Sequence, residues 1–331
     1  MATHVHHPDD HSFDEHRGRA ADKPQDIPAR GWWDILTRVR REMTADNVDI
    51  MAGGLALYAL LAVFPALAAA VSIYGFFASP ADMASHLQEM SANLPEDATK
   101  ILQQQLTDLS EHPQDTLSIG IIVGIVLALW SARKGMVALM TATNVAYDEE
   151  EERGFFKQLF VSMAFTLGAV IGFLAVLALG VAVPVVLAFI PLGPAAEIVV
   201  LVLRWVLLFA VAVLGLAVLY RYAPDRKGAR WRWVTPGSLI ASTLWLIGSA
   251  LFAVYVRNWG SYGETYGALG GVIVLLMWFY LSGYIVILGA EINSEMERQT
   301  KKDTTTGQPK PLGERGAYSA DTVGPTAKQT K

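Results

Sequence analysis

The sequence predicts an all-α fold, a polytopic membrane bundle of about six transmembrane helices with both termini in the cytoplasm. The chain of 331 residues is 53% hydrophobic and 17% charged, against about 45–50% and about 25% in a soluble domain. Its apolar segments reach the length of about 20 residues that one helical crossing needs. Lysine and arginine also gather in alternate loops, which sets an orientation.

The first thirty residues are predicted to form a disordered cytoplasmic tail. They are polar, contain three prolines and bury too little apolar surface to offset the entropy of ordering. Their histidines could bind a transition metal, but a solvated tail is the favoured interpretation because no second shell supports a site. The tail lacks the apolar core of a cleaved signal peptide, so the first crossing is expected to act as an uncleaved anchor.

Residues 31–298 form the predicted membrane domain. In its first segment, Trp33, Leu36 and Arg40 recur at near-helical spacing, as expected of a helix in the membrane interface. Residues 299–331 are polar and are predicted to form a second disordered cytoplasmic tail. The expected crossings lie at residues 50–78, from 117 toward 144, and at 159–183, 196–220, 236–256 and 269–292.

Prolines and charges mark the ends and irregularities of these crossings. Pro65 is expected to bend the first crossing or to break its hydrogen-bond ladder. Residues 79–116 are acidic and carry apolar residues at helical spacing. This external loop therefore predicts two short amphipathic helices, broken near Pro95. Pro184, Pro191 and Pro194 mark a tight turn between the third and fourth crossings.

Orientation follows from the basic residues of the short loops, since lysine and arginine stay on the cytoplasmic side. The loops on the other side offer little more than Lys100 and Arg257. Both termini are therefore predicted to be cytoplasmic. The basic residues on that side are Arg38, Arg40, Arg41, Arg133, Lys134, Arg153, Lys157, Arg221, Arg226, Lys227, Arg230, Arg232, Arg298, Lys301 and Lys302.

Composition also excludes several function classes. A net charge of -5 and a pI near 5.8 give no general basic field, so no nucleic-acid partner is predicted. Absence of cysteine excludes disulfides and thiolate chemistry. Since no phosphate-binding loop is present, an ATP-driven pump is not expected from this chain alone. No cofactor, metal or catalytic residue is predicted.

Three stretches of the chain form a recognisable set of motifs. Residues 52–65 read AGGLALYALLAVFP, and residues 129–135 read LWSARKG. The third stretch reads YGALGGVIVLLMWFYLSGY at 266–284, followed by LGAEIN at 288–293. Together they resemble the YihY/virulence factor BrkB family of bacterial inner-membrane proteins, which also carries an old ribonuclease BN label. The resemblance covers roughly residues 31–298 and implies an inner-membrane bundle of about six helices, without a known reaction or substrate.

The sequence contains few of the residues that a ribonuclease needs. Phosphodiester cleavage usually needs clustered histidine and carboxylate groups that hold a metal or act as acid and base. Outside the tail, only His86 and His112 occur, both in the acidic external loop, which faces away from cytoplasmic RNA in the predicted topology. The protein is therefore not expected to be an enzyme.

Ionisable residues near helix ends are the main site candidates, because charge inside a bilayer costs at least about 2.5–3.5 kcal/mol each. Glu291 and Asn293 fall on the last turns of the sixth crossing, and Arg133 with Lys134 near the end of the second. An ion pair of Glu291 with Arg133 is favoured as a clamp between helices, and a gate or substrate-binding charge is the alternative. Arg204 is expected to snorkel or to pair with Glu197 rather than to serve transport.

Irregular backbone supplies the other candidates. Tyr58 with nearby glycines and Pro65 either marks a broken helix that lines a cavity or reflects close helix packing. Glu264 and Tyr266 precede Gly270 and Gly271, and together they form either a periplasmic lip or a glycine-rich packing face.

Transport or lipid translocation is the leading functional hypothesis. An amphiphilic or anionic lipid would suit an apolar bundle with basic cytoplasmic rims, although ordinary topology explains the same charges. The alternative is a non-catalytic scaffold for envelope integrity. The sequence predicts the lipid bilayer as partner and leaves substrate and oligomeric state open.

Overall fold

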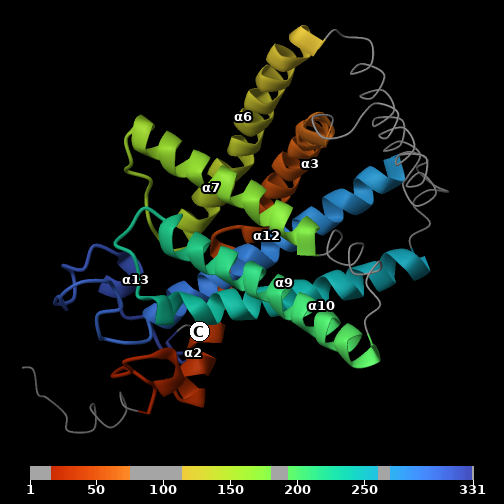
Figure 1. Ribbon diagram of the computed structural model, residues 1–331. Coiled ribbons are helices and arrows are strands. Elements are labelled where there is room, and N and C mark those ends of the chain that lie inside the picture. Colours follow the sequence, from red (N-terminus) through yellow and green to blue (C-terminus); the bar gives the residue numbers. More distant parts are fainter. Residues whose placement is uncertain (1–15, 75–113, 180–192, 260–268, 330–331) are drawn as a thin grey trace, which may run out of the picture. The chain divides into compact units, whose positions relative to one another are not determined.

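In the computed structural model, the described residues, 16–74, 114–179, 193–259 and 269–329, are helical apart from turns and loops, and they form no strand (Figure 1). One isolated bridge joins Ala229 to Thr305. The all-α prediction is confirmed. The helices are α2 (Ala29–Ala45), α3 (Val48–Tyr74), α6 (Gln114–Ala146), α7 (Phe155–Leu177), α9 (Pro194–Tyr222), α10 (Trp231–Trp259) and α12 (Leu269–Glu297), with the short η1 (Pro24–Asp26) and α13 (Tyr318–Asp321).

Four of these helices, α7, α9, α10 and α12, are long and apolar enough to cross a membrane. A fifth span is present if α2 and α3, bent by 64°, count as one. The expected crossings at 159–183, 196–220, 236–256 and 269–292 coincide with the four. The membrane fold is therefore confirmed, while the count of six and the cytoplasmic termini stay predictions. Residues 75–113, most of the predicted external loop, lie outside the described part of the chain.

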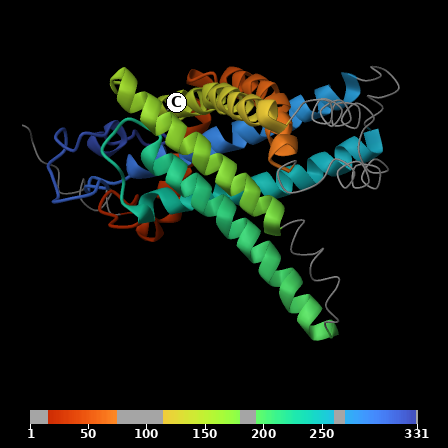
Figure 2. The same cartoon turned by 45° about the horizontal axis from the view of Figure 1, so that its top comes forward.

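The chain divides into two compact units. The first contains residues 1–51, 139–248 and 282–331, and the second contains residues 52–138 and 249–281. Within the first unit α7 packs beside α9 (Figure 2). The apolar side chains of α9 remain largely exposed, among them Ile198, Val202 and Trp205. Such a surface suits lipid rather than water.

In the second unit, α3 and α6 approach closely at a glycine. A Cβ atom added at Gly135 would lie 3.5 Å from the Cβ of Tyr58. Trp278 donates from its indole nitrogen to Ser249 Oγ over 3.2 Å, which ties α12 to α10. Helix α3 extends through Pro65, and the bend or lost hydrogen bond expected there stays a prediction.

Helices α10 and α12 meet through small residues and one amide in the first unit. Asn293 is fully buried; its Oδ1 accepts from the Gly237 N–H at 2.9 Å and its Nδ2 donates to Val234 O at 3.1 Å. These bonds flank Pro236, which lies inside α10 and lacks an N–H. At Gly289, an added Cβ would meet Tyr220 Oη at 2.4 Å. Asn293 therefore joins α12 to α10 by two hydrogen bonds.

The last turns of α12 are buried and charged. Arg38 of α2 is paired with Glu295 and also donates to Glu295 O at 2.8 Å. Glu295 accepts from Arg298 at 2.5 Å as well. Arg226 donates to both carboxylate oxygens of Glu297 at 2.8 and 2.9 Å. Since buried charge is tolerated only when paired, these contacts fix α2 and the loop after α9 against α12.

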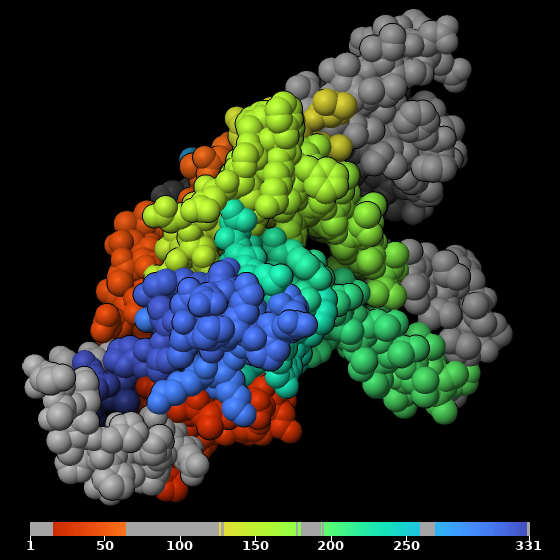
Figure 3. All heavy atoms as spheres, turned by 90° about the vertical axis from the view of Figure 1, so that its left-hand side faces the viewer, coloured from red at the N-terminus to blue at the C-terminus, as the bar shows by residue number. Residues whose placement is uncertain are grey.

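The predicted disordered tails contain two segments that the structure describes, residues 16–30 and 299–329. Residues 299–329 lie on the surface of the first unit beside the loop after α9 (Figure 3), and Lys227 donates its N–H to Gly316 O at 2.8 Å. Buried Arg315 donates to the carbonyls of Lys301 and Ala320 at 2.7 and 2.6 Å. From the other end of the chain, Arg19 donates to Gly324 O at 2.6 Å. Charge-assisted bonds to backbone thus order a segment that is poor in apolar residues.

Gly237→Ala should destabilise the first unit. Its Cβ would lie 2.4 Å from Asn293 Oδ1 and 2.4 Å from Gly289 O, so we expect a loss of roughly 1–3 kcal/mol in thermal unfolding of the purified protein in detergent. Gly215→Ala is the matched control, because nothing lies within 4 Å of its added Cβ. An equal response of the two variants would contradict the close approach of α10 and α12.

The tail packing predicts a pH effect at Glu149, which accepts the Tyr318 N–H at 2.7 Å. Burial raises the pKa of Glu149 above its ordinary value of 4.5. Because the folded state then binds the proton more tightly, this group favours folding as pH falls and opposes it as pH rises through the raised pKa. Glu149→Gln should therefore gain melting temperature over the wild type at neutral pH.

That gain should shrink as the pH falls through 4.5, because below this value the wild-type carboxyl is protonated in both states. Glu150→Gln, at the exposed neighbouring position, is the control. A gain that does not change with pH would contradict the role assigned to burial of Glu149.

Candidate functional site

An elbow between α2 and α3 positions the candidate site. Helix α2 ends at Ala45, Asp46 follows as its C-cap, and Asn47 takes a left-handed conformation with φ of 51°. Asparagine tolerates that conformation better than most residues. The Asn47 side chain also donates to Ala45 O at 3.2 Å. The chain therefore turns by 64° between the amphipathic helix α2 and the apolar helix α3.

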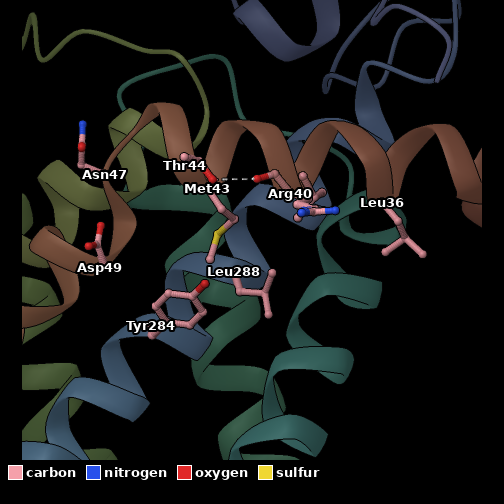
Figure 4. Close-up of a pocket in the computed structure, with 9 residues that line it drawn as sticks. Leu36, Arg40, Met43, Thr44, Asn47, Asp49, Tyr284 and Leu288 are labelled. Carbon is pink, nitrogen blue, oxygen red and sulfur yellow. Dashed lines mark hydrogen bonds between the residues drawn. The ribbon is translucent and has the colours of Figure 1, made fainter. Parts of the chain in front are cut away.

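A pocket of about 650 Å³ lies beneath this elbow, between α2 and α12 (Figure 4). Met43, Tyr284 and Leu288 lie at its centre, with Arg40 toward one end and Asp49 toward the other. The lining residues are Leu36, Val39, Arg40, Met43, Thr44, Asn47, Asp49, Tyr284 and Leu288.

The walls of the pocket differ in chemistry. Leu36, Val39, Met43 and Leu288 present hydrocarbon, whereas Arg40 contributes a guanidinium group and is exposed. The Thr44 hydroxyl group donates a hydrogen bond to Arg40 O at 3.2 Å, as the dashed line in Figure 4 shows. An apolar wall beside a cationic group fits a molecule that has an anionic head and an apolar chain.

A buried acid adjoins the pocket. Glu291 follows Leu288 by one turn of α12, is 1% exposed, and has no hydrogen-bond partner at Oε1. The carboxyl group of Asp46, the residue beside Asn47, lies close enough for the two acids to interact. Two carboxyl groups can bond only when one carries the proton. Glu291 therefore links α12 to the elbow.

Several residues that the sequence grouped together fall in different units. Glu291 and Asn293 belong to the first unit, whereas Arg133 and Lys134 belong to the second. Arg133 lies 5.5 Å over the Trp130 ring, and Lys134 is exposed. The Glu291 to Arg133 pair stays a prediction.

Other candidates are only partly described. Arg204 lies 5.7 Å over the Trp205 ring, and the ion pairs of the described residues do not include Arg204 with Glu197. Tyr58 contacts Gly135 as given above. Gly270 is buried and Gly271 exposed. Glu264 and Tyr266 lie outside the described residues.

Sequence reasoning missed the pocket itself. It placed Arg40 only at the membrane interface and did not select Thr44, Asp49 or Tyr284. The signal for the elbow was the Asp46-Asn47 pair between an amphipathic and an apolar segment. Within the described ranges, no group of three or more His, Cys, Asp or Glu residues could hold a metal ion.

These features define an all-helical, multi-pass membrane protein with an amphipathic pocket near one end of its spans. The chain matches the family model described as Virulence factor BrkB over residues 39–312, and it belongs to that family. The resemblance seen in the sequence motifs is thereby confirmed.

Two relatives show how the similarity is distributed. A UPF0761 membrane protein of Alteromonas mediterranea is 30% identical over 259 residues, which cover 76% of this chain and 83% of the relative. The ribonuclease-like protein YfkH of Bacillus subtilis is 39% identical over 182 residues, covering 54% of this chain and 66% of the relative. No solved structure shows a significant match.

The carboxyl pair predicts a contrast between two substitutions of Glu291. Glu291→Gln should keep a near-wild-type melting temperature, because an amide donates to Asp46 without a bound proton. Glu291→Ala should lose roughly 1–3 kcal/mol, because it leaves the buried partner unsatisfied. Thermal unfolding in detergent at neutral pH measures both, with Glu197→Ala on the exposed start of α9 as control. Equal losses for Gln and Ala would count against the hydrogen bond.

Proposed function

We propose that this protein is a translocation protein of the bacterial inner membrane that binds an amphiphile with an anionic headgroup in the pocket between α2 and α12. The observation that carries the proposal is the juxtaposition of Arg40 with Met43, Tyr284 and Leu288 around about 650 Å³. Arginine binds phosphate and carboxylate oxygens as a planar fork, and the apolar wall accepts an acyl chain.

The position of the pocket supports a lipid ligand. Helix α2 exposes Trp33 and Leu36, as does a helix that lies at the headgroup level. Helix α12 is long enough to cross the bilayer. A lipid could therefore reach the pocket sideways from the leaflet, without passing through water.

In this proposal both termini are cytoplasmic and the pocket opens to the cytoplasmic leaflet. Three arginines support a cytoplasmic N-terminus. Arg38, Arg40 and Arg41 immediately precede the first apolar segment, and basic residues near a span stay on the cytoplasmic side. The proposal includes no catalytic step. The ribonuclease-like name describes the Bacillus subtilis relative, and no such activity is proposed for this chain.

A non-catalytic scaffold is the second candidate function. It is favoured by the buried pairs Arg38–Glu295 and Arg226–Glu297, which hold helices and both chain ends together. A scaffold would use the same contacts without moving a ligand. Lipid movement in vesicles therefore separates the two functions.

The test is transbilayer movement of fluorescent phosphatidylglycerol in vesicles that contain the full-length protein. Arg40→Ala should slow the movement on the order of tenfold, since charged hydrogen bonds contribute about 1.5–3 kcal/mol. Arg41→Ala is the matched control: it removes the same charge one residue away, where the side chain is exposed and does not line the pocket.

Leu288→Trp provides an independent variant, because a larger side chain fills the pocket while the charge is kept. It should also slow movement. If both variants fold and move lipid at the wild-type rate, the pocket is not the path. If wild-type vesicles move no phosphatidylglycerol faster than protein-free vesicles, the scaffold replaces the transporter.

A further inference from the structure

A second cationic feature lies at the end of α9, apart from the pocket. Arg221 occupies the last turn of that helix. Its guanidinium carbon lies 4.5 Å from the ring centroid of Trp231 and 5.2 Å from that of Tyr222. The two rings pack edge to face with centroids 6.1 Å apart. None of the three residues lines the pocket.

Neighbouring arginines have acceptors from the protein, and Arg221 differs from them. Arg153 donates to Asp225 at 3.0 Å, and Arg230 donates to Thr305 O at 2.9 Å. Arg226 has the Glu297 carboxylate. In the described part of the chain, the Arg221 Nε and Nη1 atoms are buried without a hydrogen-bond partner, and no ion pair of this residue is found.

An arginine held in this way lacks a counter-charge. Stacking on aromatic faces stabilises the guanidinium by about 0.5–2 kcal/mol, but aromatic faces do not accept its in-plane N–H groups well. Arg221 as a whole is half-buried rather than fully buried. A ligand from outside can therefore reach the side chain and supply an acceptor.

The surroundings indicate where that ligand comes from. Arg221 and Tyr222 end one candidate span, and Trp231 begins the next. Tyr222 is 50% exposed and Trp231 43% exposed, and such rings favour the level of the lipid headgroups. The feature thus lies where apolar helix gives way to a polar loop, at the depth of lipid phosphates.

We propose that Arg221, Tyr222 and Trp231 form a binding site for the phosphate group of an anionic phospholipid. The guanidinium group donates hydrogen bonds to the phosphate oxygens, and the rings hold the guanidinium plane and contact the glycerol and upper acyl carbons. This site retains a lipid at the rim of α9 and α10 and does not depend on translocation through the pocket.

The experiment measures lipid retained by the full-length protein after purification in detergent, by native mass spectrometry during titration with phosphatidylglycerol. Arg221→Gln should weaken phosphatidylglycerol binding on the order of tenfold, and Arg221→Lys should weaken it less. Arg232→Gln is the matched control, since it removes an exposed charge one residue beyond Trp231 and should bind as the wild type does.

Two further arms identify the ligand. Phosphatidylcholine should bind more weakly than phosphatidylglycerol, and inorganic phosphate should not displace the lipid; displacement by phosphate alone would assign the site to a free anion instead. Trp231→Leu, which keeps the charge, should also reduce retention. If Arg221→Gln and Arg232→Gln retain equal lipid, the proposal is wrong whether or not the pocket moves lipid.

Discussion

The buried end of α12 is the constraint on which the first unit depends. Glu295 binds Arg38 from α2 and Arg298 from its own helix, while Glu297 binds Arg226. A carboxylate buried without a partner would cost several kcal/mol, so removal of one cation penalises the whole arrangement. The same end receives the N-terminal segment, because Arg19 donates to Arg298 O and Gln299 O. Distant parts of the chain are thus held by charge rather than by apolar packing.

This anchoring explains how the pocket obtains its cation. Arg38 and Arg40 are two residues apart on α2 and so point about 200° apart around the helix. Binding of Arg38 to Glu295 fixes the rotation of α2, and Arg40 then falls on the pocket side. Asp34 reinforces this rotation through bonds from Arg17 and Ala327. The elbow at Asn47 turns the chain into α3 immediately afterwards.

The two proposed lipid contacts use arginine differently. Arg40 lies beside apolar side chains in a pocket large enough for part of an amphiphile. That arrangement suits a lipid that is bound transiently during translocation. Arg221 lies on two aromatic rings, which suits a ligand that stays. Both lie in the first unit.

Hydrophobic length and composition by themselves determined the helical membrane fold and the places of α7, α9, α10 and α12, because each crossing is a local property of about 20 residues. The family motifs could likewise be recognised in the sequence alone. Only tertiary structure showed how residues 299–329 pack, because Arg19 donates to Gly324 O from the other end of the chain. The tertiary structure also determined the pocket, since Arg40 and Leu288 are brought together by the packing of α2 on α12. It likewise showed that Asn293 forms hydrogen bonds with α10. Contacts between residues hundreds of positions apart leave no periodic signal in the sequence.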